Sequence, residues 1–193
     1  AMNQAIGLGV LDDQMAAIRD LNRNLEFRKA VKHAIDGKAF AKAMSKGPFV
    51  TVYAGGLARD SAFFDADATS FFPYNPAGAN SILDGLGLID TDGNGIRNLP
   101  NGGGDLVINL VQNKGSDNEM LIGDGMATMM AEVGIKINIK PMEDTEPTRQ
   151  AGEWEWLLVR SQQEMAFPNS GYWSDMGPVT TSSFDPHLGT DEH

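Results

Sequence analysis

The segment LIDTDGNGIRN, residues 88–98, has residue types and a spacing that could bind calcium. Asp90, Asp92 and Asn94 place side-chain oxygen atoms at every second position, and Gly95 follows them. Calcium prefers oxygen ligands, and EF-hand loops supply them at alternate positions around a sharp turn at glycine. A complete pattern of this kind would predict a calcium site.

The rest of the segment fits an EF-type loop poorly. Counted from Asp90, position 8 is Arg97, where an apolar residue is usual, and position 12 is Asn101, where a bidentate glutamate belongs. Asp, Asn and Gly in succession also suit a turn, because they tolerate left-handed backbone and hydrogen-bond to nearby amides. The sequence therefore favours a structural turn, with an intrinsic calcium site as the alternative.

The spacing of the other reactive residues gives no specific support for an enzyme. The sequence has no cysteine, which excludes disulfides, thiol catalysis and Cys-ligated zinc. The phosphate-loop, dinucleotide-binding, nucleophile-elbow and HExxH zinc patterns do not occur. Among 26 acidic residues, no spacing singles out an acid–base pair like that of glycosidases. We expect no enzymatic activity and no cofactor, and an acid–base hydrolase is the least favoured hypothesis.

The chain is strongly acidic, which limits its partners. Its 26 acidic and 15 basic residues give a formal charge of −11 over 193 residues. Such a charge repels phosphate backbones, so nucleic acid is not an expected partner. No apolar run reaches the roughly 18 residues that a membrane helix needs. The first residues lack the basic and apolar stretches of a signal peptide, and the absence of cysteine suits a bacterial extracytoplasmic protein.

Apolar periodicity and capping residues predict four helices, which must position any site. They span residues 24–35, 36–44, 75–86 and 116–133, and begin at Asn24, Asp36, Asn75 and Ser116. In the last of them, Ser116 and Glu119 form a capping box, and the expected buried stripe is Ile122, Met126, Met129, Met130 and Val133. Residues 48–74 carry many aromatic side chains without a sustained period, which favours packing over disorder.

Three segments have the pattern of β-strands: LVINLV (106–111), IKINIK (135–140) and WEWLLV (154–159). In the second, isoleucines alternate with Lys136, Asn138 and Lys140, which predicts one buried and one wet face. Trp154 and Trp156 share one face of the third strand and are predicted to lie in the core.

The order of these elements predicts a parallel sheet. The helix over 116–133 follows the first strand and a short helical stretch over 144–151 follows the second, so the order is βαβαβ. Ligands of open α/β sheets bind beyond the carboxyl ends of the strands. The expected ligand-facing segments are therefore residues 112–116, 141–145 and 160–164.

Three segments resemble motifs of the peptide, nickel and oligosaccharide class of ABC-transporter solute-binding proteins. NLEFRKAVKHAIDGKAF is similar to the R-[KQ]-A-x-x-x-[AL]-I-D-[RK] helix that opens the second lobe of that class. PYNPAGANSILDGLGLIDTDGNGI is similar to its Y-[DN]-P-x-x-A-x-x-L-L-x-x-x-G-x-x-D-x-D-G-[DN]-G segment, in which the Asp/Gly run is a turn. The helix ending in EVGIKINIKP matches its x-x-G-I-x-V-x-[IL] strand. The motifs occur in the family's order between residues 24 and 141.

The resemblance implies an α/β fold, a single lobe of a periplasmic-binding-protein-like fold with a parallel βαβαβ core over residues 106–160. Residues 1–193 would be one lobe of a two-lobed protein that closes over its ligand. The implied partners are a small-molecule or peptide ligand, the missing N-terminal lobe and an ABC permease in the membrane. The implied location is periplasmic or extracellular. Members of the family bind peptides, sugars, opines or metal chelates, and among these we expect a peptide or amino-acid-like ligand. A calcium-stabilised interaction domain is the alternative.

The resemblance also places a ligand-lining loop after the third strand. Family members often have Gly-Trp there, followed by an acidic residue that meets a peptide's amino terminus; Arg160-Ser161 stand at the Gly-Trp position and Glu164 at the acidic one. Arg160 can donate to a carboxylate and Glu164 can accept from an ammonium group, which suits a zwitterionic solute. A solvated surface loop is the alternative. The candidate ligand-binding residues, with two aromatic stacking residues last, are Arg160, Gln162, Gln163, Glu164, Tyr172 and Trp173.

Overall fold

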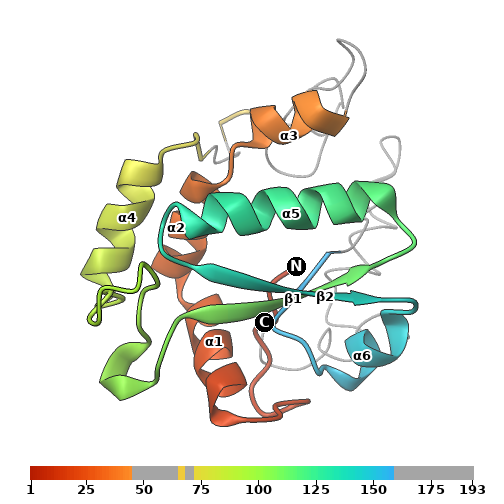
Figure 1. Ribbon diagram of the computed structural model, residues 1–193, viewed down its shortest axis with the longest axis horizontal. Coiled ribbons are helices and arrows are strands. Elements are labelled where there is room, and N and C mark those ends of the chain that lie inside the picture. The colour runs from red at the N-terminus through yellow and green to blue at the C-terminus, as the bar shows by residue number, and fades with distance from the viewer. Residues whose placement is uncertain (45–64, 68–71, 159–193) are drawn as a thin grey trace.

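Three parallel strands form the sheet of the computed structural model (Figure 1). β1 (Val107–Asn113) lies between β2 (Lys136–Met142) and β3 (Trp156–Leu157) and pairs in parallel with both. α5 (Asp117–Ala131) connects β1 to β2, and α6 (Glu146–Ala151) connects β2 to β3. The parallel βαβαβ order predicted from the sequence is confirmed.

The structure describes residues 1–44, 65–67 and 72–158. Most of the aromatic-rich segment 48–74, and everything after residue 158, lies outside the described residues. Within the described ranges, no helix is both long enough and apolar enough to cross a membrane.

Side-chain caps begin α2 (Leu25–Ala34), α3 (Gly37–Met44) and α4 (Pro76–Gly85), as the sequence predicts. In each case a side-chain oxygen accepts hydrogen bonds from backbone N–H groups of the first turn, at Asn24, Asp36 and Asn75. Each such cap satisfies donors that the helix itself leaves unpaired.

α5 begins with half of the predicted capping box. The Ser116 hydroxyl accepts the N–H of Glu119 at 3.4 Å. The Glu119 carboxylate accepts instead the N–H of Asn113, the last residue of β1, at 2.9 Å. The first turn of α5 is therefore tied directly to the carboxyl end of the central strand.

α1 (Asp13–Arg23) is an element that the sequence patterns do not predict. Its N-cap is Asp12, whose side chain accepts the N–H of Met15 at 2.7 Å. Its buried face is half polar, because it consists of Met15, Ile18, Arg19 and Asn22.

The helices cover the two faces of the sheet unequally (Figure 1). α5 packs on one face of β1 and β2, while α2 packs against α4 and α5; α6 lies on the other side of the sheet. The main core lies on the α5 face and includes Ile108 and Leu110 of β1. A smaller cluster of Val111, Trp154 and Leu157 lies on the opposite face, because neighbouring strand residues point in opposite directions.

The prediction that Trp154 and Trp156 lie in the core is confirmed, but the prediction that they share one face is wrong. Both are buried, with exposed fractions of 4% and 1%. Trp156 belongs to the main core and Trp154 to the smaller cluster with Val111 and Leu157. β3 comprises only Trp156 and Leu157. The alternation of side chains between the two faces of a strand therefore does not extend back to Trp154.

The buried stripe predicted for α5 is confirmed only near its end. Met130 and Val133 are buried, whereas Ile122, Met126 and Met129 are half-buried. On β2 the prediction of a wet face is confirmed, since Lys136, Asn138 and Lys140 are all exposed.

Candidate functional site

β1 ends at Asn113 in a turn that connects three elements. The Asn113 Oδ1 atom accepts the N–H of Gly115 at 2.7 Å, while its own N–H donates to Glu119 of α5. The Lys114 N–H donates to the carbonyl of Met142, the last residue of β2, at 2.9 Å. The carboxyl ends of β1 and β2 and the start of α5 therefore form one connected edge, where open α/β sheets bind their ligands.

An open hollow of about 570 Å³ lies at this edge and is called here the edge hollow. Its lining consists of Asn113, Gly115, Ser116, Asp117, Asn118 and Glu119. These residues offer amide, hydroxyl and carboxylate groups, and none of the six is basic. Asp117 and Glu119 already supply negative charge to the first turn of α5, where the helix dipole favours it. The edge hollow therefore suits a hydrogen-bonding neutral ligand better than an anion.

Gln112 belongs to the predicted ligand-facing segment 112–116, but it is buried. Its exposed fraction is 0%, and its Nε2 atom donates to the sulfur of Met120 at 2.8 Å. Its Oε1 atom has no hydrogen-bond partner in the described part of the chain. A Cβ atom at Gly123 of α5 would lie 1.9 Å from that oxygen, so Gly123 permits this close approach. Asn113 is half-buried, and the exposed part of the segment begins at Lys114.

Charged pairs hold the loop after β2. The Lys114 Nζ atom lies 2.5 Å from the Glu143 carboxylate. Asp144 accepts the N–H of Glu146 at 2.9 Å near the start of α6. Hydrogen bonds from the Arg149 guanidinium lower the pKa of Glu146. The predicted segment 141–145 therefore brings acidic groups to the same edge.

The third predicted segment lies beyond the described structure. The Leu158 N–H donates to the carbonyl of Val111 at 3.0 Å, so the chain still follows β1 at that point. The six candidate residues, whose part in ligand binding stays a prediction, lie outside the described residues: Arg160, Gln162, Gln163, Glu164, Tyr172 and Trp173.

The segment 88–98 forms a turn built from its own side chains. Asp90 accepts the N–H groups of Gly93 and Gly95 at 2.8 and 2.9 Å, and these hydrogen bonds lower its pKa. Asp92 accepts the N–H of Asn94 at 3.2 Å. In the described ranges, no group of three or more His, Cys, Asp or Glu side chains could hold a metal ion. The hydrogen bonds are those of the structural turn that the sequence favours.

Arg97, which is position 8 of an EF-type loop counted from Asp90, is buried and connects separate segments of the chain by hydrogen bonds. Its exposed fraction is 8%. Its guanidinium donates to Asp84 at 2.6 Å, to Asn80 at 2.8 Å and to the Val133 carbonyl at 2.7 Å. Arg97 therefore joins the turn to α4 and to the segment just after α5.

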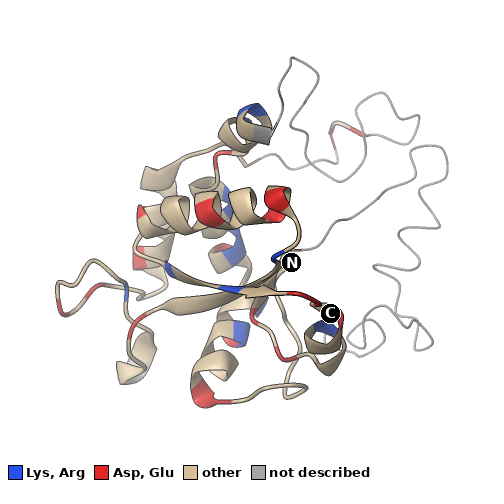
Figure 2. Ribbon diagram, turned by 45° about the vertical axis from the view of Figure 1, so that its right-hand side comes forward, with Lys and Arg blue, Asp and Glu red and all other residues tan. Residues whose placement is uncertain are grey.

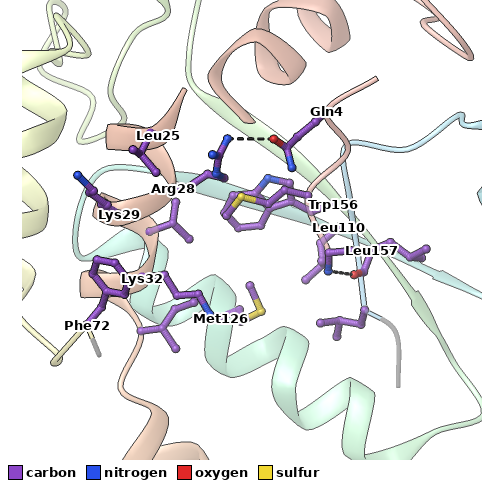
Figure 3. A pocket seen from close by; sticks show the side chains of 15 residues that line it. Gln4, Leu25, Arg28, Lys29, Lys32, Phe72, Leu110, Met126, Trp156 and Leu157 are labelled. Carbon is purple, nitrogen blue, oxygen red and sulfur yellow. Dashed lines mark hydrogen bonds between the residues drawn. The ribbon is translucent and has the colours of Figure 1, made fainter. Parts of the chain in front are cut away.

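A second hollow, called here the α2 groove, has a volume of about 480 Å³ and lies between α2, α5, β3 and the first residues (Figure 3). Its apolar lining includes Ile35, Leu110, Met126, Trp156 and Leu158. Three basic residues of α2 also line it: Arg28, Lys29 and Lys32. α5 carries acidic residues and no basic ones, and Figure 2 shows this difference in charge between the two helices.

The α2 groove is a feature that the sequence patterns do not predict, because its lining comes from segments far apart in the chain. Met2 of the first segment faces Trp156, to which it is joined by an antiparallel bridge. A local indication of the groove is Leu25, the apolar first residue of α2, which has 55% of its surface exposed. It shares a face of the helix with Arg28, Lys32 and Ile35 at helical spacing.

The chain matches a family model over residues 1–183, the middle region of the bacterial extracellular solute-binding proteins, family 5. Its sequence is 35% identical over 182 residues to the periplasmic alpha-galactoside-binding protein of Rhizobium meliloti (strain 1021). That alignment covers 91% of this chain and 26% of the relative.

Two solved structures resemble the fold over nearly the whole chain. The periplasmic binding protein MelB of Agrobacterium fabrum C58, solved with stachyose, is 33% identical with a TM-score of 0.85, covering 98% of this chain and 30% of that protein. The oligopeptide-binding protein OppA is 19% identical with a TM-score of 0.79, covering 95% of this chain and 28% of that protein. The second similarity shows a shared fold only. The chain therefore spans between a quarter and a third of the length of these relatives.

Proposed function

Because the chain belongs to the bacterial extracellular solute-binding proteins of family 5, we propose that it is part of the substrate-binding component of an ABC importer. Such a component captures a small solute outside the cytoplasmic membrane and delivers it to a permease. The observation that carries the proposal is the family match over residues 1–183, together with 35% identity to a relative named for periplasmic binding. Capture and release require no covalent chemistry.

The proposed ligand is an oligosaccharide of the α-galactoside class. One relative above 30% identity is named for α-galactoside binding, and another was solved with stachyose. A peptide or amino-acid-like ligand, which the sequence analysis predicts, is the second candidate. The likeness to OppA does not support it, because at 19% identity only the fold is shared. Arg160-Ser161, at the position where the family often has Gly-Trp, also departs from the peptide-binding pattern.

The edge hollow has the chemistry that an oligosaccharide requires. Sugar hydroxyl groups both donate and accept hydrogen bonds, and they carry no charge. The exposed Asp117 carboxylate can accept from such hydroxyls, and the exposed Asn118 amide can donate as well as accept. The Glu119 carboxylate already accepts a hydrogen bond from the Asn113 N–H, so its role is to hold the turn after β1 in place. We propose that this edge forms one wall of the binding cleft.

In the whole protein, we propose, residues 1–193 form one lobe, a second lobe supplies the opposite wall of the cleft, and an ABC permease receives the ligand. The location is periplasmic or extracellular. Arg160, Gln162, Gln163, Glu164, Tyr172 and Trp173 follow β3 and are proposed to line the same cleft.

Calorimetric titration of the longer protein that contains residues 1–193 tests the proposal. We expect saturable binding of stachyose and raffinose, and much weaker binding of trialanine. Tighter binding of the peptide would favour the second candidate, and the absence of binding to either class would contradict both.

A matched pair of variants tests the edge hollow. Asn118→Ala removes a neutral hydrogen-bonding group worth about 1 kcal/mol, so the Kd for stachyose should rise roughly fivefold. Thr128→Ala, an exposed change farther along α5, should leave the Kd unchanged. Equal Kd values for both variants and the wild type would place the sugar elsewhere.

A further inference from the structure

Asn94 is followed by Gly95 in the turn of residues 88–98, and both residues are exposed. An asparagine followed by glycine loses its side-chain amide more readily than other asparagines, because glycine has no side chain to hinder the approach of its nitrogen to the asparagine Cγ atom. The sequence contains this dipeptide once more, at Asn101-Gly102. The turn at Asn94 is therefore a candidate site of covalent modification.

The reaction needs only the chain itself and water. The Gly95 nitrogen bonds to the Asn94 Cγ atom as the Cγ–Nδ2 bond breaks, and the side-chain amide leaves as ammonia with the proton that the Gly95 nitrogen loses. Water then opens the cyclic imide at either carbonyl, which yields aspartate or isoaspartate at position 94. No group is oxidised or reduced.

Hydrogen bonds hold the amide that would leave. The Asn94 Nδ2 atom donates to both carboxylate oxygens of Asp105, at 3.1 and 3.2 Å, and to Asp92 at 3.2 Å. Hydrogen bonds to charged acceptors are stronger than those between neutral groups. Loss of the amide as ammonia breaks all of these contacts, so they favour the intact asparagine.

The attacking nitrogen is held as well. The Gly95 N–H donates to the Asp90 carboxylate at 2.9 Å, which fixes the peptide group whose nitrogen must bond to Asn94. The same hydrogen bond lowers the pKa of Asp90, so this carboxylate stays ionised. Negative charge develops on the Asn94 side-chain oxygen during the attack, and the charge of Asp90, like those of the two carboxylates at the amide, opposes it.

One contact acts in the opposite direction. The Ile96 N–H donates to the Asn94 Oδ1 atom at 2.7 Å. A donor at this oxygen stabilises the charge that develops there during the attack. The turn therefore already polarises the reacting carbonyl, and the restraint on the reaction comes from its carboxylates.

We infer that Asn94 is a latent deamidation site, at which the hydrogen bonds to Asp90 and Asp105 keep the amide intact and loss of either one lets the cyclic imide form. The inference goes beyond the proposed solute binding and does not depend on it.

Deamidation at Asn94 would weaken the turn that restrains it. The product has no Nδ2 donor and places a further carboxylate beside Asp92 and Asp105. Asp105 forms an antiparallel bridge with Asn98 just before β1. The modified turn is therefore held less firmly beside the central strand.

Mass spectrometry measures the rate of the reaction. The folded protein and the peptide LIDTDGNGIRN, which lacks Asp105 and the surrounding fold, are incubated side by side at mildly alkaline pH. Trypsin cleaves after Arg97, so Asn94 and Asn101 fall on separate fragments. We expect Asn94 to deamidate at least about tenfold more slowly in the folded protein, because holding a reacting group away from its productive position is costly in rate. Equal rates, or a faster reaction in the folded protein, would overturn the inference.

Two single substitutions test which contacts restrain Asn94. Asp90→Ala and Asp105→Ala should each raise the rate of deamidation in the folded protein toward that of the peptide. Glu153→Ala, which removes an exposed carboxylate before β3, is the control and should leave the rate unchanged. An unchanged rate in both turn variants would contradict the restraint. Slower deamidation in Asp90→Ala would also contradict it, and would show that this carboxylate accepts the Gly95 proton and promotes the reaction.

Melting temperatures test the consequence of the reaction. Asn94→Asp reproduces one product, and Asn94→Ala removes the same donor without adding charge. We expect the larger decrease for Asn94→Asp, and the difference should shrink at high salt, because screening weakens the repulsion from Asp92 and Asp105. Equal melting temperatures for the two variants would contradict this repulsion. Tryptophan fluorescence, to which the buried Trp154 and Trp156 contribute, establishes that each variant is folded before its rate or melting temperature is compared.

Discussion

At the residue scale, two buried arginines hold backbone segments together. Arg97 lies in a segment that resembles a calcium loop, yet it anchors that segment to α4 and to Val133, just after α5. Arg19 is 1% exposed and donates to the carbonyls of Leu8 and Gly152, joining the first residues to the segment before β3. An arginine side chain has several donors in a fixed plane, so it can satisfy several buried carbonyls at once. Neither role can be predicted from the sequence, because the carbonyls come from distant segments.

We expect Arg97→Met to destabilise the protein. The substitution leaves the buried carbonyls of Leu88 and Val133 without their donor. Loss of such contacts should lower the free energy of unfolding by about 2–4 kcal/mol, measured by urea denaturation. The control is Lys136→Met on the exposed face of β2, for which we expect a change below about 0.5 kcal/mol. Equal changes in the two variants would show that Arg97 is not a cross-link.

Glu155 gives a prediction of pH dependence. Its exposed fraction is 1%, and burial raises its pKa, although the N–H groups of Asn109 oppose the shift by donating to its carboxylate. The nearby charges are Asp12, which raises the pKa, and Arg19, which lowers it. The folded state therefore binds the proton more tightly than the unfolded chain does. This contribution to stability is full below the unfolded-state pKa of about 4.3 and is lost as the pH rises through the folded-state pKa.

Glu155→Gln removes this titration. We expect the wild type to lose stability relative to Glu155→Gln as the pH rises from about 4 to neutral. Urea denaturation at several pH values measures the difference, and the exposed change Glu153→Gln controls for net charge. A difference that does not depend on pH, or that changes in the opposite direction, would refute the burial of a carboxylate at this position.

At the element scale, the helices with apolar faces and capping side chains could be predicted from the sequence. α2, α3 and α4 begin where Asn24, Asp36 and Asn75 predict, because a cap is a local interaction. α1 could not be predicted, since Arg19 and Asn22 on its buried face interrupt the apolar period. These polar groups are buried because distant carbonyls accept their hydrogen bonds, and that information is absent from the local sequence.

We expect Asn75→Ala to weaken α4. The Asn75 side chain accepts the N–H of Gly78 at 3.0 Å, and its loss should lower the free energy of unfolding by about 1 kcal/mol. Ser81→Ala, an exposed change within the same helix, is the control and should be close to neutral. A larger effect of Ser81→Ala in chemical denaturation would contradict the role of Asn75 as the cap.

At the scale of the whole molecule, the order of strands and helices allows the position of the candidate binding edge to be predicted, but not its detailed lining. The carboxyl ends of β1 and β2 do meet beside the start of α5, as parallel pairing requires. Gln112 could not be recognised as buried, because its position depends on the approach of Gly123 from α5. The α2 groove could not be recognised either, since segments at both ends of the described chain contribute to it.

We expect the 1–193 chain to bind stachyose at least about tenfold more weakly than the longer protein does. Specific sites bury roughly 70–90% of a ligand's surface, and a single wall of a cleft provides only part of that contact. Parallel calorimetric titrations of both proteins measure the ratio of their Kd values. The same Kd for both would show that one lobe is a complete binding site.

The pairing of the first residues with the segment around β3 has a consequence for the order of events during folding. Asn3 donates to the carbonyls of Gly152 and Trp154, Asn22 donates to that of Glu155, and the Trp156 indole donates back to Asn22. These partners are separated by 133 to 151 residues in the sequence. A chain emerging from the ribosome reaches the N-terminal partners long before the C-terminal ones, and contacts of such high sequence separation form slowly. On the polar face of α1, Arg19 and Asn22 can therefore donate to the first residues as soon as these are synthesised, but their remaining hydrogen bonds form only after the segment around β3 has been added.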